Sequence, residues 1–467
     1  MQLKTSLLPH QAAAVEKLRR LKVGALYMEQ GTGKTRTALE LVKIRLDAGK
    51  INRVLWLCPC SVKRNLALDI RKHADVDAGV ITICGIETLS GSVRTASELL
   101  ADVKAHDAMI VVDESALVKN ASALRTQRIT LLASYCKYKV ILNGTPLSNN
   151  EADLFSQWFL LDYRILGYHS WYTFARNHLV FDDKYPEKIR SVKNTDYLAA
   201  RIAPYTFQIK KEECLQLPPK QCSPRYFDMT DEQSAHYEDV VDRFLELVQT
   251  SADTGSSAYI SKLFTALQEV ASGKRILSEA QETLRHEPFF ADPEDNPRIQ
   301  ALLSVIEETG GEKAVIWCRY RLEIDEIMSA LASHGWSAVR FDGSVNQKHR
   351  QENLSKFEDN ARFLVANKTC AGFGLNLQYC RNAIYYSNDW SWGTRAQSED
   401  RLHRIGQNQT VRLWDICANH TLDEQILDCL SRKGNLVDEF KKAIHKRNFA
   451  DWLKGKPEKD LIDVGRE

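Results

Sequence analysis

The stretch that decides the fold reads "GALYMEQGTGKT" and covers residues 24–35. A short apolar run comes first, a glycine-rich turn follows, and the helix-periodic stretch "RTALELVKIRL" (36–46) comes next. Strand, glycine turn and helix in this order form a phosphate loop, because successive backbone N–H groups and the helix N-terminus surround an anion. A chance glycine-rich turn before a helix is the alternative. The sequence therefore predicts an α/β domain that binds a nucleotide.

Each residue of the predicted loop has an expected task. Gly31, Thr32 and Gly33 would wrap the phosphates, and Lys34 would reach the outer ones. The hydroxyl of Thr35 would bind Mg²⁺.

Hydrolysis of the nucleotide needs a carboxylate that holds the metal and a group that positions water. The stretch "MIVVDES" (109–115) supplies both, because Asp113 and Glu114 follow four apolar residues. Ligand sites of α/β sheets lie at the carboxyl ends of the strands, where this pair is expected. We expect Asp113 to hold Mg²⁺ and Glu114 to position the attacking water; an acidic pair that only caps a strand is the alternative.

Short apolar runs occur in two separate series. The first comprises "VLWLCP" (54–59), "MIVVDE" (109–114) and "VILNGTP" (140–146), and the second comprises "AVIWCR" (314–319), "RFLVAN" (362–367) and "AIYYSN" (383–388). Continuous rather than alternating hydrophobicity is typical of strands buried on both faces. Helix-periodic stretches separate the runs, so the pattern predicts two α/β lobes with parallel sheets, joined by a helical and irregular region.

The expected domain boundaries follow from this pattern. We predict a first lobe with the nucleotide motifs at 1–150, a helical protrusion and the end of that lobe at 151–215, a linker with a second helical protrusion at 216–296, a second lobe at 297–430, and a C-terminal helix or tail at 431–467.

Composition narrows the class of protein. In 467 residues, 63 Lys and Arg nearly balance 61 Asp and Glu, so a nucleic-acid site would have to be a local groove. No apolar stretch reaches membrane-spanning length, and "MQLKTSLLPHQ" (1–11) lacks the apolar core of a signal peptide. The 11 cysteines include no C-x-x-C pair, so we expect no zinc site and a reduced, cytoplasmic protein.

A late stretch, "QSEDRLHRIGQ" (397–407), is expected to form a helix ended by Gly406. Residues three or four apart share a helix face, so Gln397, Arg401 and Arg404 would project together. A solvated, salt-bridged helix is the alternative. Arginines inserted from a neighbouring element stabilise the charge that builds on the γ-phosphate, so Arg401 and Arg404 are candidate fingers that act when the two lobes close.

Seven stretches occur in an order that carries a family resemblance. They are "LLPHQAAAVEKL" (7–18), "VLWLCPCSVKRN" (54–65), "DESALVKN" (113–120), "LNGTPLSNN" (142–150), "RFDGSVNQKHRQENLSKF" (340–357), "GFGLNL" (372–377) and "NDWSWGTRAQSEDRLHRIGQ" (388–407). The series resembles the Swi/Snf-type DNA translocases of helicase superfamily two, over about residues 5 to 430. The resemblance implies two RecA-like lobes in tandem and a minimal member of bacterial or bacteriophage type.

The resemblance also implies roles for individual residues. Gln11 would contact adenine, and Gly374 and Gln397 would contribute to nucleotide binding. The residues that would contact the DNA backbone are Pro59, Ser61 and Lys63 in the first lobe and Lys368, Thr369 and Trp390 in the second. Phosphate contacts carry no sequence information, so DNA binding would be sensitive to salt and largely nonspecific.

This chain departs from the family pattern at several positions. Met28 replaces the first glycine of the phosphate loop, and Ser115 and Ala116 occupy the positions of an Ala-His pair. Asn143 stands where threonine is usual, and Ala371 where glycine is usual. The pair Lys368-Thr369 likewise replaces a common Thr-Arg pair.

The resemblance implies a DNA-dependent ATPase that uses ATP and Mg²⁺ to move along double-stranded DNA without processive strand separation. A helicase that remodels or anneals branched DNA shares every motif and remains open, as does an ATPase-dead nucleic-acid-binding scaffold suggested by Ala116. We expect a monomer in the cytoplasm of a bacterial or phage-infected cell, with no membrane association.

Overall fold

The chain divides into two compact units, Met1–Gln216 and Leu217–Glu467, in a computed structural model. The structure describes residues 1–144, 151–181, 189–250, 257–278, 284–368, 375–437 and 453. The region 216–296, predicted as a linker and second protrusion, belongs to the second unit from Leu217 onward. In these ranges no helix combines the length and apolar character needed to cross a membrane.

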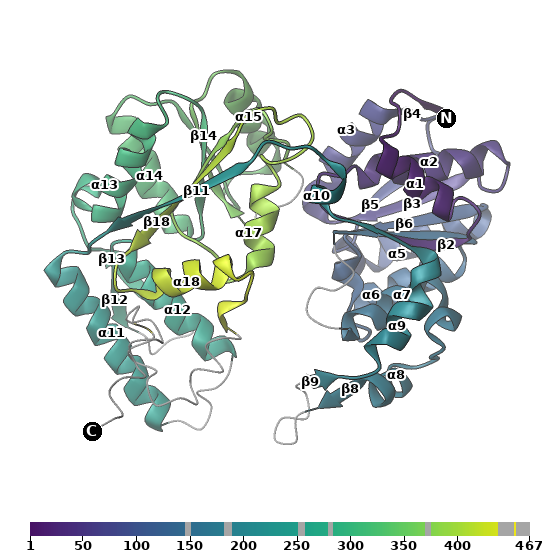
Figure 1. Ribbon diagram of the computed structural model, residues 1–467, viewed down its shortest axis with the longest axis horizontal. Coiled ribbons are helices and arrows are strands. Elements are labelled where there is room, and N and C mark those ends of the chain that lie inside the picture. The colour runs from purple at the N-terminus through teal and green to yellow at the C-terminus, as the bar shows by residue number, and fades with distance from the viewer. Residues whose placement is uncertain are drawn as a thin grey trace. The chain divides into compact units, whose positions relative to one another are not determined.

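Unit 1 is built on a six-stranded parallel sheet with the order β10-β2-β7-β6-β3-β5 (Figure 1). Its strands are β2 (Val23–Met28), β3 (Arg53–Cys58), β5 (Ile81–Gly85), β6 (Ala108–Asp113), β7 (Tyr138–Asn143) and β10 (Thr206–Ile209), and β1 (Gln2–Leu3) pairs with β4 (Ala74–Asp75) beside it. Its helices are α1 (Pro9–Leu18), α2 (Lys34–Asp47), α3 (Lys63–His73), α4 (Thr88–Gly91), α5 (Val93–Ala105), α6 (Leu124–Ser134), α7 (Ala152–Leu166), α8 (Trp171–His178), α9 (Thr195–Ile202) and α10 (Lys211–Cys214).

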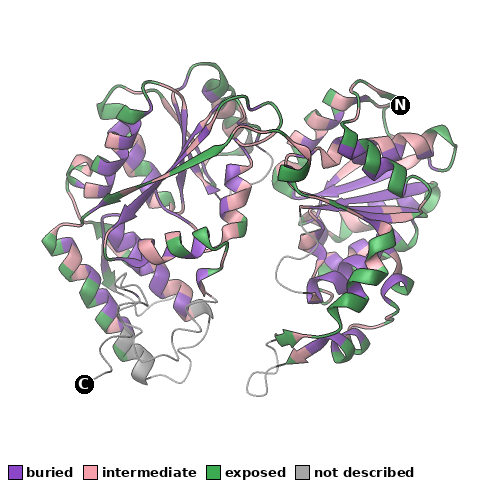
Figure 2. Ribbon diagram, in the orientation of Figure 1, coloured by how far each residue is buried: buried purple, intermediate pink, exposed green. Residues whose placement is uncertain are grey.

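The central strands of this sheet are largely apolar because both of their faces are covered (Figure 2). Alternate side chains enter two cores: Ala25 and Tyr27 of β2 pack with α5, α6 and α7, whereas Leu26 and Met28 pack with α1, α2 and α3. The two-residue period of a strand thus sorts one apolar run into two layers. The protrusion predicted after residue 150 consists of α7, α8, α9 and a small hairpin of β8 (Leu179–Phe181) and β9 (Ile189–Val192).

Unit 2 carries a second six-stranded parallel sheet with the order β11-β18-β17-β14-β16-β15. Its strands are β11 (Lys220–Phe227), β14 (Ala314–Cys318), β15 (Ala338–Phe341), β16 (Phe363–Asn367), β17 (Asn382–Tyr385) and β18 (Val411–Ala418), and β12 (Lys274–Ser278) pairs with β13 (Arg285–Pro288) beside it. Its helices are α11 (Asp231–Thr250), α12 (Ser257–Ala271), α13 (Pro297–Glu308), α14 (Arg321–Ser333), α15 (Gln347–Asp359), α17 (Trp392–Glu399) and α18 (Leu422–Ser431). The two sheets confirm the predicted tandem of RecA-like α/β lobes.

The edge strand β11 was not among the predicted strands. Most of its residues are exposed, so the chain there lacks the continuous apolar run of a central strand. Its parallel partner β18 lies almost two hundred residues later in the chain, with Lys220 opposite Val411 and Pro224 opposite Asp415. Pro224 fits an edge position, because a proline cannot donate a ladder hydrogen bond.

Candidate functional site

The predicted phosphate loop lies between the end of β2 at Met28 and the start of α2 at Lys34. Gly31 and Gly33 adopt left-handed φ angles of 82° and 89°, which only glycine adopts without strain. Gly33 is the N-cap of α2 and has no side chain to cover the first amides of the helix. These amides and the positive end of the helix dipole are suited to an anion.

Gln11 of α1 holds the loop from the side. Its Nε2 donates to the carbonyl of Thr32 at 3.0 Å, while its Oε1 accepts from the Leu8 amide at 3.0 Å. His10 Nε2 lies 2.8 Å from the same Thr32 carbonyl. A Cβ atom at Gly33 would lie 2.1 Å from Gln11 Nε2, so the glycine is needed for space as well as for conformation. Sequence reasoning had assigned Gln11 to adenine and had missed this loop-positioning contact and His10.

Lys34 and Asp113 lie at the carboxyl edge of the sheet, within electrostatic reach of each other. Lys34 Nζ donates to the Met28 carbonyl at 2.9 Å. Burial raises the pKa of Asp113 to about 6, the Lys34 ammonium acts in the opposite direction, and the neighbouring Glu114 adds to the rise. An ammonium and a carboxylate within electrostatic reach of each other are the pair that a metal-nucleotide complex needs.

Glu114 follows Asp113 in a left-handed conformation with φ of 53°, which is uncommon for a residue with a side chain. Its backbone N–H donates to Asp113 Oδ1 at 3.0 Å, so the turn holds the Asp113 carboxyl group. Thr35, in the first turn of α2, is partly buried. The structure therefore brings the loop, Lys34, Thr35, Asp113 and Glu114 to one end of one lobe.

These residues fit a nucleotide with Mg²⁺. In addition to the loop and the carboxyl pair, Asn143 ends β7, the strand between β2 and β6. Its Nδ2 is buried and has no hydrogen-bond partner within the described part of the chain, whereas its Oδ1 accepts from the Gly144 amide at 2.9 Å. An unsatisfied buried donor at this edge is suited to a phosphate oxygen or a water molecule.

The altered acidic motif has its own structural partner. The hydroxyl of Ser115, fully buried, donates to Oε1 of the equally buried Gln157 on α7 at 2.6 Å. Gln157 Nε2 then donates to the Asp153 carbonyl at 2.8 Å, and the Lys119 ammonium lies 3.5 Å from the Asp153 carboxylate. The segment that carries Asp113 and Glu114 is thus tied to the first helix of the protrusion. The sequence showed Ser115 as a departure but gave no signal for Gln157.

The residues predicted to contact DNA in unit 1 lie after β3. Pro59 is buried, whereas Ser61 and Lys63 are at least partly exposed at the start of α3. The Cys60 amide between them donates to Glu87 Oε2 at 2.8 Å, which fixes the turn. The side chains of Ser61 and Lys63 are available to an anionic backbone, and the assignment of all three stays a prediction.

The expected helix through Arg401 and Arg404 was wrong. The helix α17 ends at Glu399, and residues 400–406 form successive turns. The Arg401 carbonyl accepts from the Leu377 amide at 3.0 Å, and Leu402 is fully buried in the lobe core, so tertiary contacts draw the chain out of the helix.

The side chains of the finger candidates consequently do not share one helix face. Arg401 is buried, and its Nε donates to the Gln397 carbonyl at 3.1 Å. Arg404 is partly buried and bonds to Asn376 Oδ1. Gln397 is partly buried on α17. Gly374 and Thr369 lie outside the described residues, so their predicted roles are not addressed.

Lys368 and Trp390, predicted to contact DNA, are both engaged within unit 2. Lys368 is 1% exposed, and its ammonium donates to the Ser387 carbonyl at 2.7 Å. Burial lowers the pKa of Lys368 to about 8, against the opposing effect of Asp389. Trp390 Nε1 donates to Gln268 Oε1 at 2.7 Å. Neither side chain is freely offered to a ligand in this arrangement, and their DNA contacts stay predictions.

Two family models match separate parts of the chain. A model described as SNF2-related domain matches residues 76–276, and one described as helicase conserved C-terminal domain matches residues 297–406. The chain belongs to the Swi/Snf-type group of helicase superfamily two. The two matches follow the order of the predicted motifs, with the phosphate loop preceding the first.

Relatives of this Swi/Snf-type chain come from fungi and bacteria. A TATA-binding protein-associated factor mot1 of Aspergillus fumigatus is 26% identical over 68% of this chain and 19% of its own length. An uncharacterized ATP-dependent helicase of Mycoplasma pneumoniae is 26% identical over 96% of this chain and 43% of its own length. The chain therefore spans less than half the length of these relatives.

Among solved structures, a Sulfolobus solfataricus SWI2/SNF2 ATPase core in complex with dsDNA is 22% identical to this Swi/Snf-type chain. The alignment has a TM-score of 0.42 and covers 98% of this chain and 97% of that one.

Proposed function

We propose that the chain is an ATP-driven motor that moves along double-stranded DNA without reading its sequence. The observation that carries this proposal is a glycine-rich loop at the start of α2, with Lys34 following it and Asp113 ending a strand of the same sheet, in a chain of the Swi/Snf-type family. The Mycoplasma relative, named an ATP-dependent helicase, supports ATP and a nucleic acid as the two ligands.

The proposed roles follow the geometry of unit 1. The amides of Gly31 to Lys34 and the Lys34 ammonium would hold the phosphates, and Thr35 and Asp113 would hold Mg²⁺. Bound Mg²⁺ neutralises charge on the phosphate oxygens. Glu114 would orient the attacking water and accept its proton, because it follows Asp113 directly at the carboxyl end of β6.

In this proposal, hydrolysis depends on closure of the two lobes, because it needs the arginines of unit 2. Arg401 and Arg404 would reach the γ-phosphate only in a closed state of the two lobes, and Gln397 would assist binding. Stabilisation of transition-state charge by such a finger raises turnover rather than substrate affinity. Coupling closure to DNA contacts by Ser61 and Lys63 would convert each cycle into a step along the duplex.

All of the proposed site residues come from one chain, so a monomer is sufficient. We place the activity in a bacterial cytoplasm, in keeping with the Mycoplasma relative and with the free cysteines of the described residues, most of which are buried.

ATP turnover with and without double-stranded DNA tests the function. We expect DNA to stimulate turnover, and Lys34→Ala and Glu114→Gln to abolish it while DNA binding persists. Lys50→Ala, which removes an exposed lysine after α2, serves as the control and should behave as wild type. Turnover by Lys34→Ala at the wild-type rate would refute the site.

Arg404→Ala tests the finger separately. We expect kcat to fall by about 10³-fold with little change in KM, because the contact is made in the transition state. A fall in ATP affinity with unchanged kcat would remove the finger assignment. Replacing the duplex by forked DNA in an unwinding and annealing assay distinguishes a motor from a fork-remodelling helicase.

A further inference from the structure

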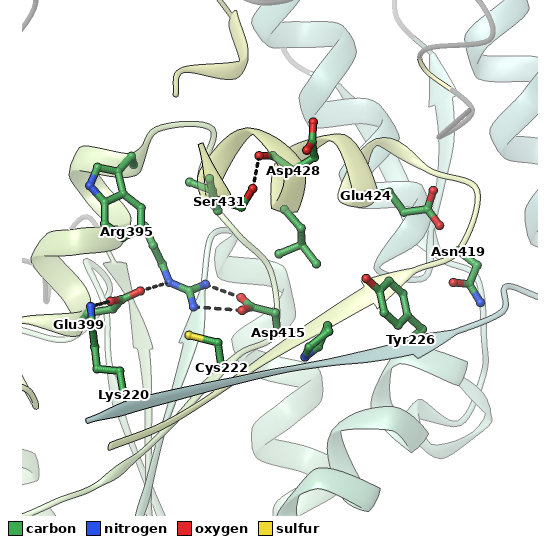
Figure 3. A pocket seen from close by; sticks show the side chains of 14 residues that line it. Lys220, Cys222, Tyr226, Arg395, Glu399, Asp415, Asn419, Glu424, Asp428 and Ser431 are labelled. Atoms are coloured by element: carbon green, nitrogen blue, oxygen red, sulfur yellow. Dashed lines mark hydrogen bonds and ion pairs between the residues drawn. The ribbon is translucent and has the colours of Figure 1, made fainter. Parts of the chain in front are cut away.

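A run of alternating charges crosses the interior of unit 2 (Figure 3). Lys220 Nζ lies 2.7 Å from Glu399 Oε2, and Glu399 Oε1 accepts from Arg395 Nε at 2.7 Å. The other side of the Arg395 guanidinium forms a forked pair with Asp415, with Nη2 at 3.0 Å from Oδ2. Arg395 thus lies between two carboxylates, from α17 and β18.

The run continues from Asp415 toward the end of β16. Asn388 Nδ2 donates to Asp415 Oδ1 at 2.7 Å, and Asn388 Oδ1 accepts from Arg395 Nη1 at 2.8 Å. The Lys368 ammonium lies 3.5 Å from Asn388 Oδ1 and 3.9 Å from an oxygen of Asp389. Asp389 in turn pairs with Arg319. We call this series the charge ladder: Lys220, Glu399, Arg395, Asp415, Asn388, Lys368, Asp389 and Arg319.

The members of the ladder depend on one another because most of them are shielded from water. Arg395, Glu399, Asp415 and Lys368 are all buried. Burial alone would raise the pKa of Asp415, but the Arg395 guanidinium outweighs this effect and the pKa lies below its ordinary value. The Arg395 guanidinium also lies over the Tyr385 ring, 3.4 Å from its centroid. A shift of one charge therefore changes the energy of its neighbours strongly, since water cannot compensate.

The two ends of the ladder lie next to segments with different tasks. Glu399 is the last residue of α17, two residues before Arg401. Lys220 begins β11 and pairs with Glu399. Just before β11, the carbonyl of Pro218 lies 2.8 Å from His403 Nε2. These two contacts attach the start of unit 2 to the finger segment and to the helix that precedes it. Lys368, in the second half of the ladder, follows β16 in the segment predicted to face DNA.

Space for movement lies beside the ladder. A cavity of about 790 Å³ is lined by residues of β11, α17 and α18, with Lys220, Arg395, Glu399 and Asp415 among them (Figure 3). This pocket is partly open to the surface, so α17 can shift on that side without first displacing a close-packed neighbour.

We propose that Arg395 is a positioning residue that couples the finger segment of Arg401 and Arg404 to the DNA-facing segment at Lys368 through the charge ladder. The inference rests on the proposed function. In it, DNA binding shifts the Lys368 end, the shift passes through Asn388 and Asp415 to Arg395, and Glu399 carries it to the finger segment. ATP binding shifts the same ladder in the reverse direction.

The test uses a variant that removes charge in a balanced way. Arg395→Met/Asp415→Asn deletes one cation and one anion and leaves Lys220 paired with Glu399, so no lone charge is buried. The matched control is Arg298→Met/Asp423→Asn, which removes a buried ion pair of the same lobe that lies outside the ladder. The measurements on the full chain are ATP turnover with and without double-stranded DNA, and DNA affinity with and without a non-hydrolysable ATP analogue.

We expect the ladder variant to keep basal turnover within about twofold of wild type and to lose about tenfold in stimulation by DNA, a typical strength for coupled sites. Coupling between two binding events is reciprocal, so the effect of the ATP analogue on DNA affinity should shrink as well. The control should retain both effects. A purely structural role would lower basal and stimulated rates together.

Full stimulation in the ladder variant, or an equal loss in the control, overturns the proposal. If the double variant does not fold, Arg395→Lys keeps the cation but loses the forked pair with Asp415, and unchanged stimulation there also overturns the proposal. Absence of stimulation in the wild type would instead refute the proposed function, and the ladder's role with it.

Discussion

Gly33 shows how one residue can meet two demands at once. Its φ of 89° excludes most side chains on conformational grounds, and the Gln11 amide occupies the place where a Cβ would stand. Gln11 cannot easily move away, because it is buried and bonded to both Leu8 and Thr32. The shape of the phosphate loop therefore depends on the absence of a single methyl group.

Gly33→Ala should abolish ATP turnover, because the loop must shift to relieve the contact with Gln11. Gly49→Ala is the matched control: Gly49 also has a positive φ, 61°, but nothing lies within 4 Å of its Cβ position. The control should lose only about 1 kcal/mol of stability from backbone strain and retain turnover. Similar activity losses in both variants would show that strain alone, and not the Gln11 contact, is responsible.

At the scale of single residues, the sequence predicts the chemical role of a residue better than it predicts which side chains surround that residue in the fold. The spacing of Lys34 and Thr35 after a glycine turn is sufficient to specify a phosphate loop. The neighbours of Asn143 and the internal engagement of Lys368 depend on residues far away in the chain, which no local pattern reports.

At the scale of elements, α7 is attached to the acidic motif by the hydrogen bond between Ser115 and Gln157. Ser115→Ala should destabilise unit 1 by about 1 to 3 kcal/mol, because Gln157 Oε1 is left buried without its donor. Gln157→Leu should be destabilising for the converse reason.

The double variant Ser115→Ala/Gln157→Leu should recover most of the lost stability, since two apolar side chains leave no polar group unsatisfied. Thermal unfolding of the wild type, the two single variants and the double variant measures the interaction energy between the two side chains. Losses that simply add in the double variant would mean that the two side chains do not act as a pair.

Helix α12 contains a carboxyl group that titrates far from its usual range. Burial raises the pKa of Glu269 to about 7, Glu323 adds to the rise and Lys274 opposes it. Because the pKa is raised in the folded state, this carboxyl favours folding at low pH, and the contribution is lost as pH rises from about 4.5 to about 7.

Glu269→Gln mimics the protonated acid and should therefore stabilise unit 2 at pH 8, on the order of 2 kcal/mol, with little gain at pH 5. Glu287→Gln, at an exposed carboxyl group on β13, is the control and should show no such pH dependence. The measurement is the unfolding temperature at both pH values. A variant less stable than wild type at pH 8 would contradict the expected sign.

Central strands could be predicted from their apolar runs, because strands buried on both faces must be continuous. The edge strands β10 and β11 could not, since a half-exposed strand resembles a loop until its partner is known. The helix expected through Arg404 failed for a related reason: helix propensity at 400–406 was outweighed by the burial of Leu402 and the bond from Leu377.

At the scale of the whole molecule, each of the two units has hydrophobic cores of its own. The residues proposed to hold phosphates and Mg²⁺ all belong to unit 1. Calorimetry should therefore show two unfolding transitions, and Mg²⁺-ADP should raise the unfolding temperature of only one of them, that of unit 1.

At a ligand concentration about 100 times the dissociation constant, the raised transition should gain about 2.7 kcal/mol. Lys34→Ala should abolish the shift and leave the second transition unchanged. One cooperative transition that responds as a whole would show that the units do not unfold independently.

The position of Pro224 in β11 has a consequence for how the protein behaves at high concentration. The outer margin of this sheet exposes backbone groups that could template a strand from another molecule. Pro224, in the middle of this edge strand, has no backbone N–H to donate and therefore interrupts any such pairing. We therefore expect Pro224 to disfavour fibrous self-association of this protein through the β11 edge.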